Sequence, residues 1–232
     1  MRGGRPAAGS GAARPGPSVW RSLRAAASSF VDDVGSFLVA NLIWLAVAAV
    51  TALARAVYPP ALVTGLLLVP VTCGLTRMAA WAARGDAARV RQFAGGVRHR
   101  FWLHLTLGAG QCLLLAVALL NVTIGLNAGG ALRILAAVVS GYVALLTWLL
   151  AVAAWPVLLD PQRHALRWTA ALRLAMAVVV RRPVGMVVIA SIEAVLVAVS
   201  VQTVVPAVFL PSYGALLAAH YVLPLADSLV EG

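Results

Sequence analysis

Long apolar stretches without charge alternate with short arginine-rich segments along this chain. Five stretches contain no Asp, Glu or Arg apart from Glu193 in the last one: 34–54, 56–76, 101–132, 134–159 and 183–226. About 20 helical residues cross a hydrocarbon core about 30 Å thick. The pattern therefore predicts an all-α fold, a polytopic transmembrane helical bundle.

Turn signals divide these stretches into six membrane helices, expected near 34–53, 61–82, 101–123, 134–158, 184–205 and 212–229. Tyr58-Pro59-Pro60 separates the first pair, and a Gly-rich turn ending at Gly129-Gly130 separates the second. The last stretch is about twice as long as one crossing requires, and Pro206 and Pro211 mark a break within it. A count of five crossings, with the last segment in the interface and the C-terminus outside, stays open.

The distribution of arginine predicts the orientation. All 18 basic residues are Arg, and most of those after residue 83 gather in two loops, whereas the other two loops hold one Arg each. The positive-inside rule places both Arg-rich loops and both termini in the cytoplasm. We expect their arginines to contact anionic headgroups of the inner leaflet or a partner protein. They are Arg84, Arg89, Arg91, Arg98, Arg100, Arg163, Arg167, Arg173, Arg181 and Arg182.

Both Arg-rich loops also carry apolar residues at helical spacing. Each is expected to form an amphipathic helix on the inner leaflet, so that the bundle has two interfacial helices besides its membrane helices. The apolar faces comprise Val90, Phe93, Val97 and Phe101 in the first loop, and Ala165, Trp168, Leu172, Met176 and Val179 in the second.

Composition supports a membrane protein, because 62% of residues are hydrophobic, 11% are charged and the mean hydropathy is +0.94. The net charge of +11 would suggest nucleic acid in a soluble chain, but here the arginines flank membrane helices, so no nucleic-acid partner is expected. Residues 1–29 are rich in Gly, Ala, Pro, Ser and Arg and are expected to be a disordered basic tail. Residues 30–232 are expected to form a single helical membrane domain.

Glu193 is the only acidic residue in the interior of a predicted membrane helix, and it lies near the middle of that helix. An ionised carboxylate there costs several kcal/mol without a partner. One hypothesis is an intramembrane polar site that relays a proton or cation, with Arg77, His104 or His220 as partner. The alternative is a neutral Glu that hydrogen-bonds to a neighbouring helix.

Motifs of enzymes, pumps and metal sites are missing from the sequence. No GxSxG, HExxH or Walker motif occurs, the four histidines are scattered, and each of the two cysteines lies alone in a predicted membrane helix. The sequence therefore predicts no catalytic residue, no cofactor and no metal site.

Short motifs resemble the YesL family of small bacterial integral membrane proteins, a domain of unknown function. The resemblance is good over about 30–101 and loose over about 166–225. It rests on Asn41-Leu42-Ile43-Trp44-Leu45, on Pro70-Val71-Thr72 with Gly74-Leu75, on Arg84-Gly85-Asp86, on Val90-Arg91-Gln92-Phe93 and on Val97-Arg98-His99-Arg100-Phe101. The long basic tail, and Gln92 to Gly96 in place of an acidic-aromatic motif, depart from the family pattern.

The resemblance implies a multi-pass protein of the bacterial inner membrane, with no established catalytic residue and with genes often beside those for sugar uptake. We therefore expect a non-catalytic accessory or assembly partner of a membrane complex, such as the permease subunits of a carbohydrate ABC importer. The alternative is a small carrier or channel that uses Glu193 at the membrane midplane. A homo-oligomer is compatible with either function.

Overall fold

The structure is a computed structural model that describes residues 18–57, 64–203, 206 and 208–231. This part of the chain is all α and contains no strand, which confirms the predicted fold class. Its α-helices are α1 (Val19–Asp32), α2 (Val34–Val57), α3 (Leu68–Ala83), α4 (Val90–Arg98), α5 (Phe101–Ala128), α6 (Ala131–Leu159), α7 (Trp168–Arg181), α8 (Pro183–Gln202) and α10 (Leu210–Val230).

Six of these helices are long and apolar enough to cross a membrane: α2, α3 with the 3-10 turn before it, α5, α6, α8 and α10. They correspond to the six predicted membrane helices, and their ends differ from the predicted ones by a few residues. The predicted turn at Tyr58-Pro59-Pro60 lies outside the described residues.

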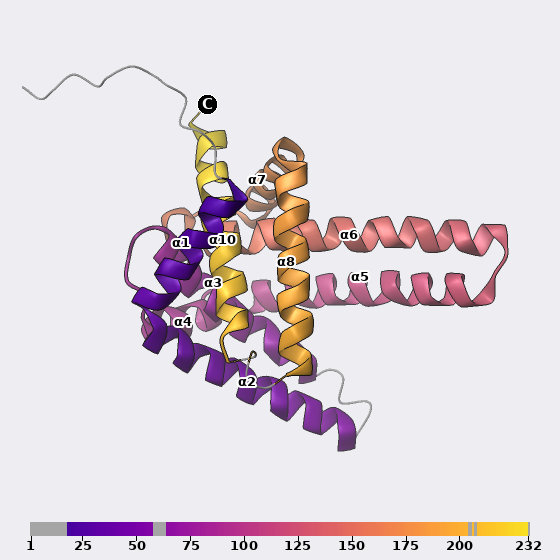
Figure 1. Ribbon diagram of the computed structural model, residues 1–232, viewed down its shortest axis with the longest axis horizontal. Coiled ribbons are helices and arrows are strands. Elements are labelled where there is room, and N and C mark those ends of the chain that lie inside the picture. Colours follow the sequence, from indigo (N-terminus) through magenta and orange to yellow (C-terminus); the bar gives the residue numbers. More distant parts are fainter. Residues whose placement is uncertain (1–17, 58–63, 204–205, 207, 232) are drawn as a thin grey trace, which may run out of the picture.

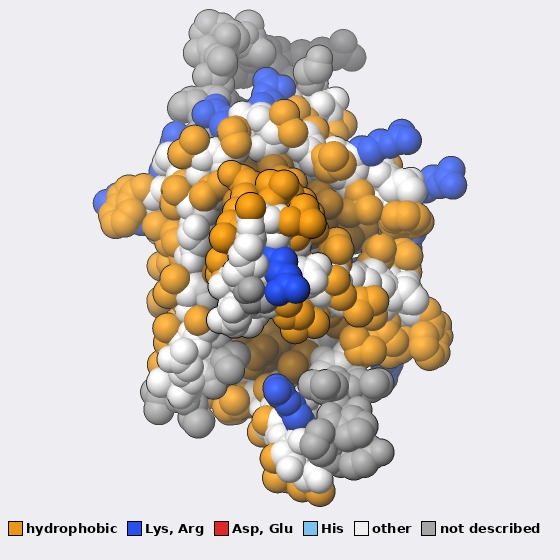
Figure 2. All heavy atoms as spheres, turned by 90° about the vertical axis from the view of Figure 1, so that its right-hand side faces the viewer, with side chains coloured by type: hydrophobic (Ala, Val, Ile, Leu, Met, Phe, Trp, Pro, Cys, Tyr) orange, Lys and Arg blue, Asp and Glu red, His pale blue; other side chains and the backbone are white. Residues whose placement is uncertain are grey.

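The membrane helices form a compact body and a projecting hairpin. Figure 1 shows α5 and α6 side by side, extending away from the body and crossing α8 and α10 steeply. In α3 and α10, 56% of the most apolar stretch is buried, against 11% in α5 and 17% in α6. The core of the described chain therefore lies around α3 and α10, while the hairpin presents most of its surface outward. Figure 2 views this hairpin end-on and shows mainly hydrophobic side chains on that face.

Small residues allow α4 to pack closely on α3. A Cβ atom on Gly96 of α4 would lie 2.8 Å from the carbonyl oxygen of Cys73, and one on Gly74 of α3 would lie 2.7 Å from the ring of Phe93. Neither position has room for a side chain unless the helices move apart. Phe93 is buried against α3, so this residue of the predicted apolar face packs in the protein, while Val90 of the same face is 40% exposed.

The second predicted amphipathic helix exists as α7, but its buried face differs from the predicted one. Ala171, Ala175 and Val178 are buried, whereas Trp168 is 43% and Met176 is 55% exposed. The helix has apolar residues on two faces. The face with Ala171 and Ala175 packs closely in the protein, whereas the predicted face is divided: Leu172 and Val179 are partly buried against the core, and Trp168 and Met176 are exposed.

The expected disordered tail is wrong in its last part, because Val19 to Ser29 belong to α1. Ser18 caps this helix by accepting a hydrogen bond from the backbone N–H of Arg21. Ala26 is completely buried, and Val19, Leu23 and Phe30 pack against the same core. This 4-3-4 spacing was a helical signal that the Gly, Ser and Arg content obscured. Residues 1–17 lie outside the described part of the chain.

Candidate functional site

A cavity of about 300 Å³ lies in the bundle, and all six membrane helices contribute to its lining. Most of its surface is apolar. One residue from each of α2, α3, α5, α6, α8 and α10 illustrates the arrangement: Trp44, Thr72, Gln111, Trp155, Glu193 and Gly214.

Three tryptophans line this cavity, and each indole N–H already donates a hydrogen bond to a protein acceptor. The ring nitrogens are therefore directed to the protein, and what remains for a ligand is the carbon surface of the rings. The bonds join Trp44 to the hydroxyl of Thr72 (3.2 Å), Trp148 to the carbonyl of Ala190 (2.9 Å) and Trp155 to the amide oxygen of Gln111 (3.0 Å).

Other hydroxyl groups of the lining are also satisfied within the protein. Thr76 donates to the carbonyl of Thr72 at 3.0 Å, and Ser200 donates to the carbonyl of Leu196 at 2.7 Å. Hydroxyl groups in membrane helices commonly donate to a carbonyl of the preceding turn, which satisfies the donor inside the helix.

Glu193 differs from these groups. Within the described chain its carboxyl group has no hydrogen-bond or ion-pair partner, and it is the only charged group among the lining residues. A Cβ atom on Gly214 would lie 3.9 Å from Glu193 Cγ, so this glycine of α10 faces the side chain. An ionised carboxylate at this depth is unfavourable unless a cation or hydrogen-bond donors accompany it. The cavity therefore offers one carboxyl group to whatever enters it.

The three partners predicted for Glu193 do not line the cavity. Arg77 packs beside Gly95 and Gly96 of α4. His220 lies 3.0 Å from the hydroxyl of Ser29 and so belongs to the contact between α10 and α1. The neutral alternative, in which Glu193 hydrogen-bonds to a neighbouring helix, has no such bond in the described residues.

His104 is buried on α5 and contacts Trp155, which lines the cavity. Its ring centroid lies 6.0 Å from Trp155 and 6.0 Å from His99, and its Nδ1 atom has no hydrogen-bond partner among the described residues. His99 lies outside the membrane helices, where burial lowers its pKa and the positive charges of Arg77, Arg100 and His164 lower it further. Of the four residues predicted to form the intramembrane polar site, Glu193 lines the cavity, whereas Arg77, His104 and His220 lie outside its lining.

Sequence reasoning missed the aromatic wall of this cavity. Trp148 and Trp155 are seven residues apart and therefore lie on one face of α6, a spacing that was available in the sequence. No spacing in the sequence indicated that Trp44 and Gln111 line the same cavity, because they belong to two other helices.

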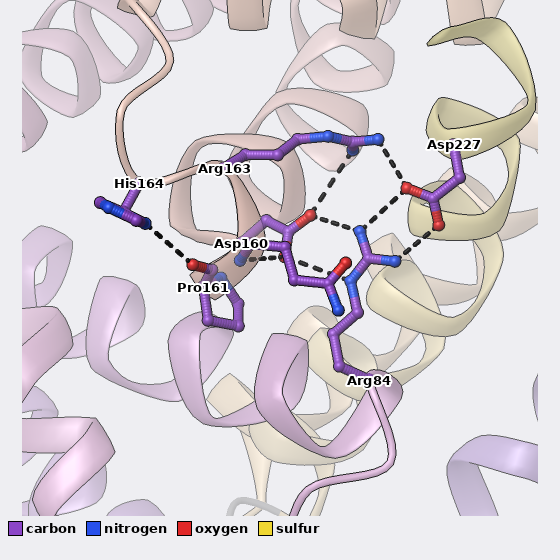
Figure 3. A network of polar contacts seen from close by, with 7 residues as sticks. Arg84, Asp160, Pro161, Arg163, His164 and Asp227 are labelled. Atoms are coloured by element: carbon purple, nitrogen blue, oxygen red, sulfur yellow. Dashed lines mark hydrogen bonds and ion pairs between the residues drawn. The ribbon is translucent and has the colours of Figure 1, made fainter. Parts of the chain in front are cut away.

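A second polar feature, which we call the ion-pair cluster, consists of Arg84, Asp160, Arg163 and Asp227. Figure 3 shows the Arg84 guanidinium between the two carboxylates. Arg84 bonds to both oxygens of Asp160 and to both oxygens of Asp227, the latter at 2.5 and 3.0 Å. Arg163 adds a bond of 2.6 Å to Asp227 and an ion pair of 3.5 Å to Asp160.

The ion-pair cluster balances two positive against two negative charges in a largely buried place. The side chain of Asp160 is completely buried, and that of Arg84 is 11% exposed. Burial alone would lower the pKa of Arg84, but the hydrogen bonds and negative charges of Asp227 and Asp160 raise it above its ordinary value. Arg84 therefore stays charged under all ordinary conditions.

This arrangement corrects the prediction for Arg84 and Arg163, which are bound to acids rather than directed to headgroups. Nearby carboxylates compete with the membrane surface because they are prepositioned by the ends of α6 and α10. Arg100 is exposed but donates to the carbonyls of Leu166 and His164, which ties the start of α5 to the second loop. The other predicted contact residues are exposed: Arg89, Arg91, Arg98, Arg167, Arg173, Arg181 and Arg182.

The ion-pair cluster also relates the ends of three membrane helices. Arg84 follows α3, Asp160 follows α6, and Asp227 lies in the last turn of α10. These three C-terminal ends meet, so α10 ends beside the starts of both Arg-rich loops.

Among residues 18–57, 64–203, 206 and 208–231, no group of three or more His, Cys, Asp and Glu side chains is arranged to hold a metal ion. In comparisons with known proteins, no protein-family model, no curated protein and no solved structure matched this chain.

Proposed function

We propose that this protein is a small membrane carrier that binds its substrate in the cavity beside Glu193. One observation carries the proposal: all six membrane helices line one cavity, and among the described residues its only charged group is a carboxyl without a partner. Pockets between the helices of a bundle are common ligand sites. An ionisable group kept inside a membrane helix is a functional-site candidate, since it costs stability.

A carrier must also open its site to each side of the membrane in turn. Pro156 of α6 lines the cavity and cannot donate a hydrogen bond to the carbonyl of Val152 one turn earlier. The helix is therefore easier to bend beside the site than elsewhere. We propose that α6 bends here when the cavity changes sides.

Cysteine accessibility tests this proposal without knowledge of the substrate. Cys73 and Cys112, the only cysteines, are replaced by Ala, and one Cys is introduced at Ala215 in the cavity lining. A membrane-impermeant maleimide is then applied to right-side-out and inside-out vesicles. We expect labelling from both sides, because the cavity of a carrier faces each side part of the time.

Ala198 provides the matched control, since it lies on the exposed face of α8 and does not line the cavity. A Cys there should react from neither side, because lipid covers it. Labelling of the Ala215 position from one side only, or from neither side, would contradict alternating access.

The second candidate is the accessory role in a membrane complex. It is favoured by the α5–α6 hairpin, which projects from the body and exposes apolar residues along its length, including Leu113, Leu120 and Leu146. The test is purification in mild detergent followed by mass spectrometry. Recovery of transporter permease subunits in equal amounts supports this role, and recovery of the protein alone contradicts it.

We further propose that the protein resides in a bacterial inner membrane with the ion-pair cluster on the cytoplasmic side. Exposed arginines gather on this side, while the loops on the other side hold Arg55 and Arg133 only. Reporter fusions after Val230 and within the Gly129-Gly130 turn test it. A cytoplasmic signal from the first and an external signal from the second are expected, and the reverse would overturn the orientation.

A further inference from the structure

We propose that the cavity binds a monovalent organic cation with a compact apolar body. This inference rests on the proposed function and specifies its substrate class. It is carried by the combination of one carboxyl group and three tryptophans in a lining that is otherwise mostly apolar, among the residues that the structure describes.

The charge of the lining decides the sign of the ligand. Within the part of the chain that the structure describes, Glu193 is the only charged lining residue, and Arg77, His104 and His220 are absent from the lining. An anion in the cavity would meet the carboxyl group of Glu193 and no cation. An ionised carboxylate would repel the anion, and a neutral carboxyl group would leave its negative charge without a counter-charge. A ligand with one positive charge would neutralise Glu193 and remove the cost of keeping that carboxylate in the bilayer.

The tryptophans decide the kind of cation. Their N–H groups are bound to Thr72, Ala190 and Gln111, so the rings offer carbon surface and π-electrons. Aromatic rings attract cations whose charge is spread over alkyl groups, and tryptophan does so best. A dehydrated metal ion would instead need several oxygen ligands, and the lining supplies one carboxyl group, while its amide and hydroxyl oxygens already take part in hydrogen bonds within the protein.

The remaining polar groups are few for a strongly hydrated ligand, since the amide NH2 of Gln111 is the main side-chain donor of the lining without a partner in the described residues. The hydroxyls of Thr76 and Ser200 donate to carbonyls of their own helices. A sugar would bring several hydroxyl groups that need partners, and most of the lining is apolar. The volume of about 300 Å³ lies at the lower end of small-molecule pockets, which favours a compact cation over a large multi-ring one.

Equilibrium dialysis of radiolabelled benzyltrimethylammonium against the purified full-length protein in detergent tests the inference. The wild type should bind it, and excess neopentylbenzene should not displace it, because this neutral molecule has the same shape without the charge. Benzenesulfonate should not displace it either. Displacement by the neutral compound would show that the cavity recognises shape alone and would overturn the inference.

Two substitutions connect the binding to the proposed residues. Glu193→Gln should weaken binding about tenfold or more, because the ion pair with the ligand is lost. Trp148→Leu should weaken it about fivefold through loss of the cation–π contact. The matched control is Glu231→Gln, which removes an exposed acid and should leave the affinity unchanged.

Folding of the Glu193→Gln protein is checked by gel filtration and circular dichroism, and Glu193→Asp, which keeps the charge, should retain most of the binding. Equal binding by wild type and a folded Glu193→Gln protein would overturn the inference. The two proposals can fail separately. If the protein binds no cation but the Ala215 position is labelled from both sides, the substrate class is wrong and the carrier function stands. If the protein binds the cation but the position is labelled from one side only, the carrier function is wrong and the binding site stands.

Discussion

Replacing Arg84 with Gln removes the central cation of the ion-pair cluster and should destabilise the protein strongly. Arg84 donates to both carboxylates, and the Asp160 side chain is completely buried. Removing one partner of a buried ion pair typically costs about 3–5 kcal/mol, because the other charge remains without compensation. Here Asp160 keeps Arg163 at 3.5 Å, and Asp227 is 33% exposed to solvent. We therefore expect the lower end of that range, about 3 kcal/mol.

Thermal unfolding in mild detergent measures this effect. A loss of about 3 kcal/mol corresponds to a decrease in Tm of about 6–12 °C for a chain of this size. The matched control is Arg98→Gln, since the Arg98 side chain is exposed and has no hydrogen bond or ion pair in the described residues. Its Tm should change by less than about 2 °C, as for other surface substitutions.

A double-mutant cycle separates the pair from other effects. Asp160→Asn alone should destabilise the protein as Arg84→Gln does, and the double variant should lose less than the sum of the two single losses, since they share one interaction. Equal Tm values for Arg84→Gln and Arg98→Gln, or additive losses in the cycle, would refute the reasoning.

Three further predictions concern other parts of the bundle. Asn41→Leu should lower the free energy of unfolding by about 1–3 kcal/mol, because the buried N–H and hydroxyl of Ser212 both donate to the Asn41 side chain, at 3.2 and 2.7 Å. Gly96→Ala should cost about 1–3 kcal/mol in the same detergent assay, because the added Cβ atom would meet α3 at 2.8 Å. For His99, the lowered pKa means that below about pH 6.5 the unfolded chain binds more protons than the folded one, so stability falls with falling pH. His99→Gln should therefore reduce the loss of Tm between about pH 6.5 and 5.

Controls for these three predictions are available in the chain. Gly110 is also helical, but no atom lies within 4 Å of its added Cβ, so Gly110→Ala should be neutral or stabilising. If Gly96→Ala behaves in the same way, the close approach of α3 and α4 is not tight. A Tm of Asn41→Leu equal to the wild type would show that water replaces the amide, and an unchanged pH profile for His99→Gln would assign the acid sensitivity to another group.

Membrane helices were predictable because each is a local property of the sequence. A run of about 20 apolar residues needs no information from other segments, since the bilayer supplies the environment that buries it. The same reasoning found α4 and α7, whose periodicity is local. It failed at Val19 to Ser29, where the composition indicates a disordered tail although Val19, Leu23 and Phe30 have helical spacing.

The candidate site was predictable only in part. Glu193 was identified because any acid in a membrane helix is conspicuous, and the choice needed no knowledge of its neighbours. The partners predicted for Glu193 do not line the cavity. The linear sequence does not say which faces of six helices turn toward one another. His220 faces α1 and Arg77 lies under α4, whereas Glu193 faces Gly214.

By itself the sequence determined that the chain consists of six apolar helices with arginine-rich connections, because hydrophobic length and charge distribution act within each segment. Only the tertiary structure decided that Arg84, Asp160 and Asp227 meet, and that the carboxyl group of Glu193 shares a cavity with three tryptophans. These residues come from segments up to 149 positions apart, from Trp44 to Glu193. Their proximity depends on which helix faces pack together, and this is set by side-chain shape and polar pairing across the whole bundle.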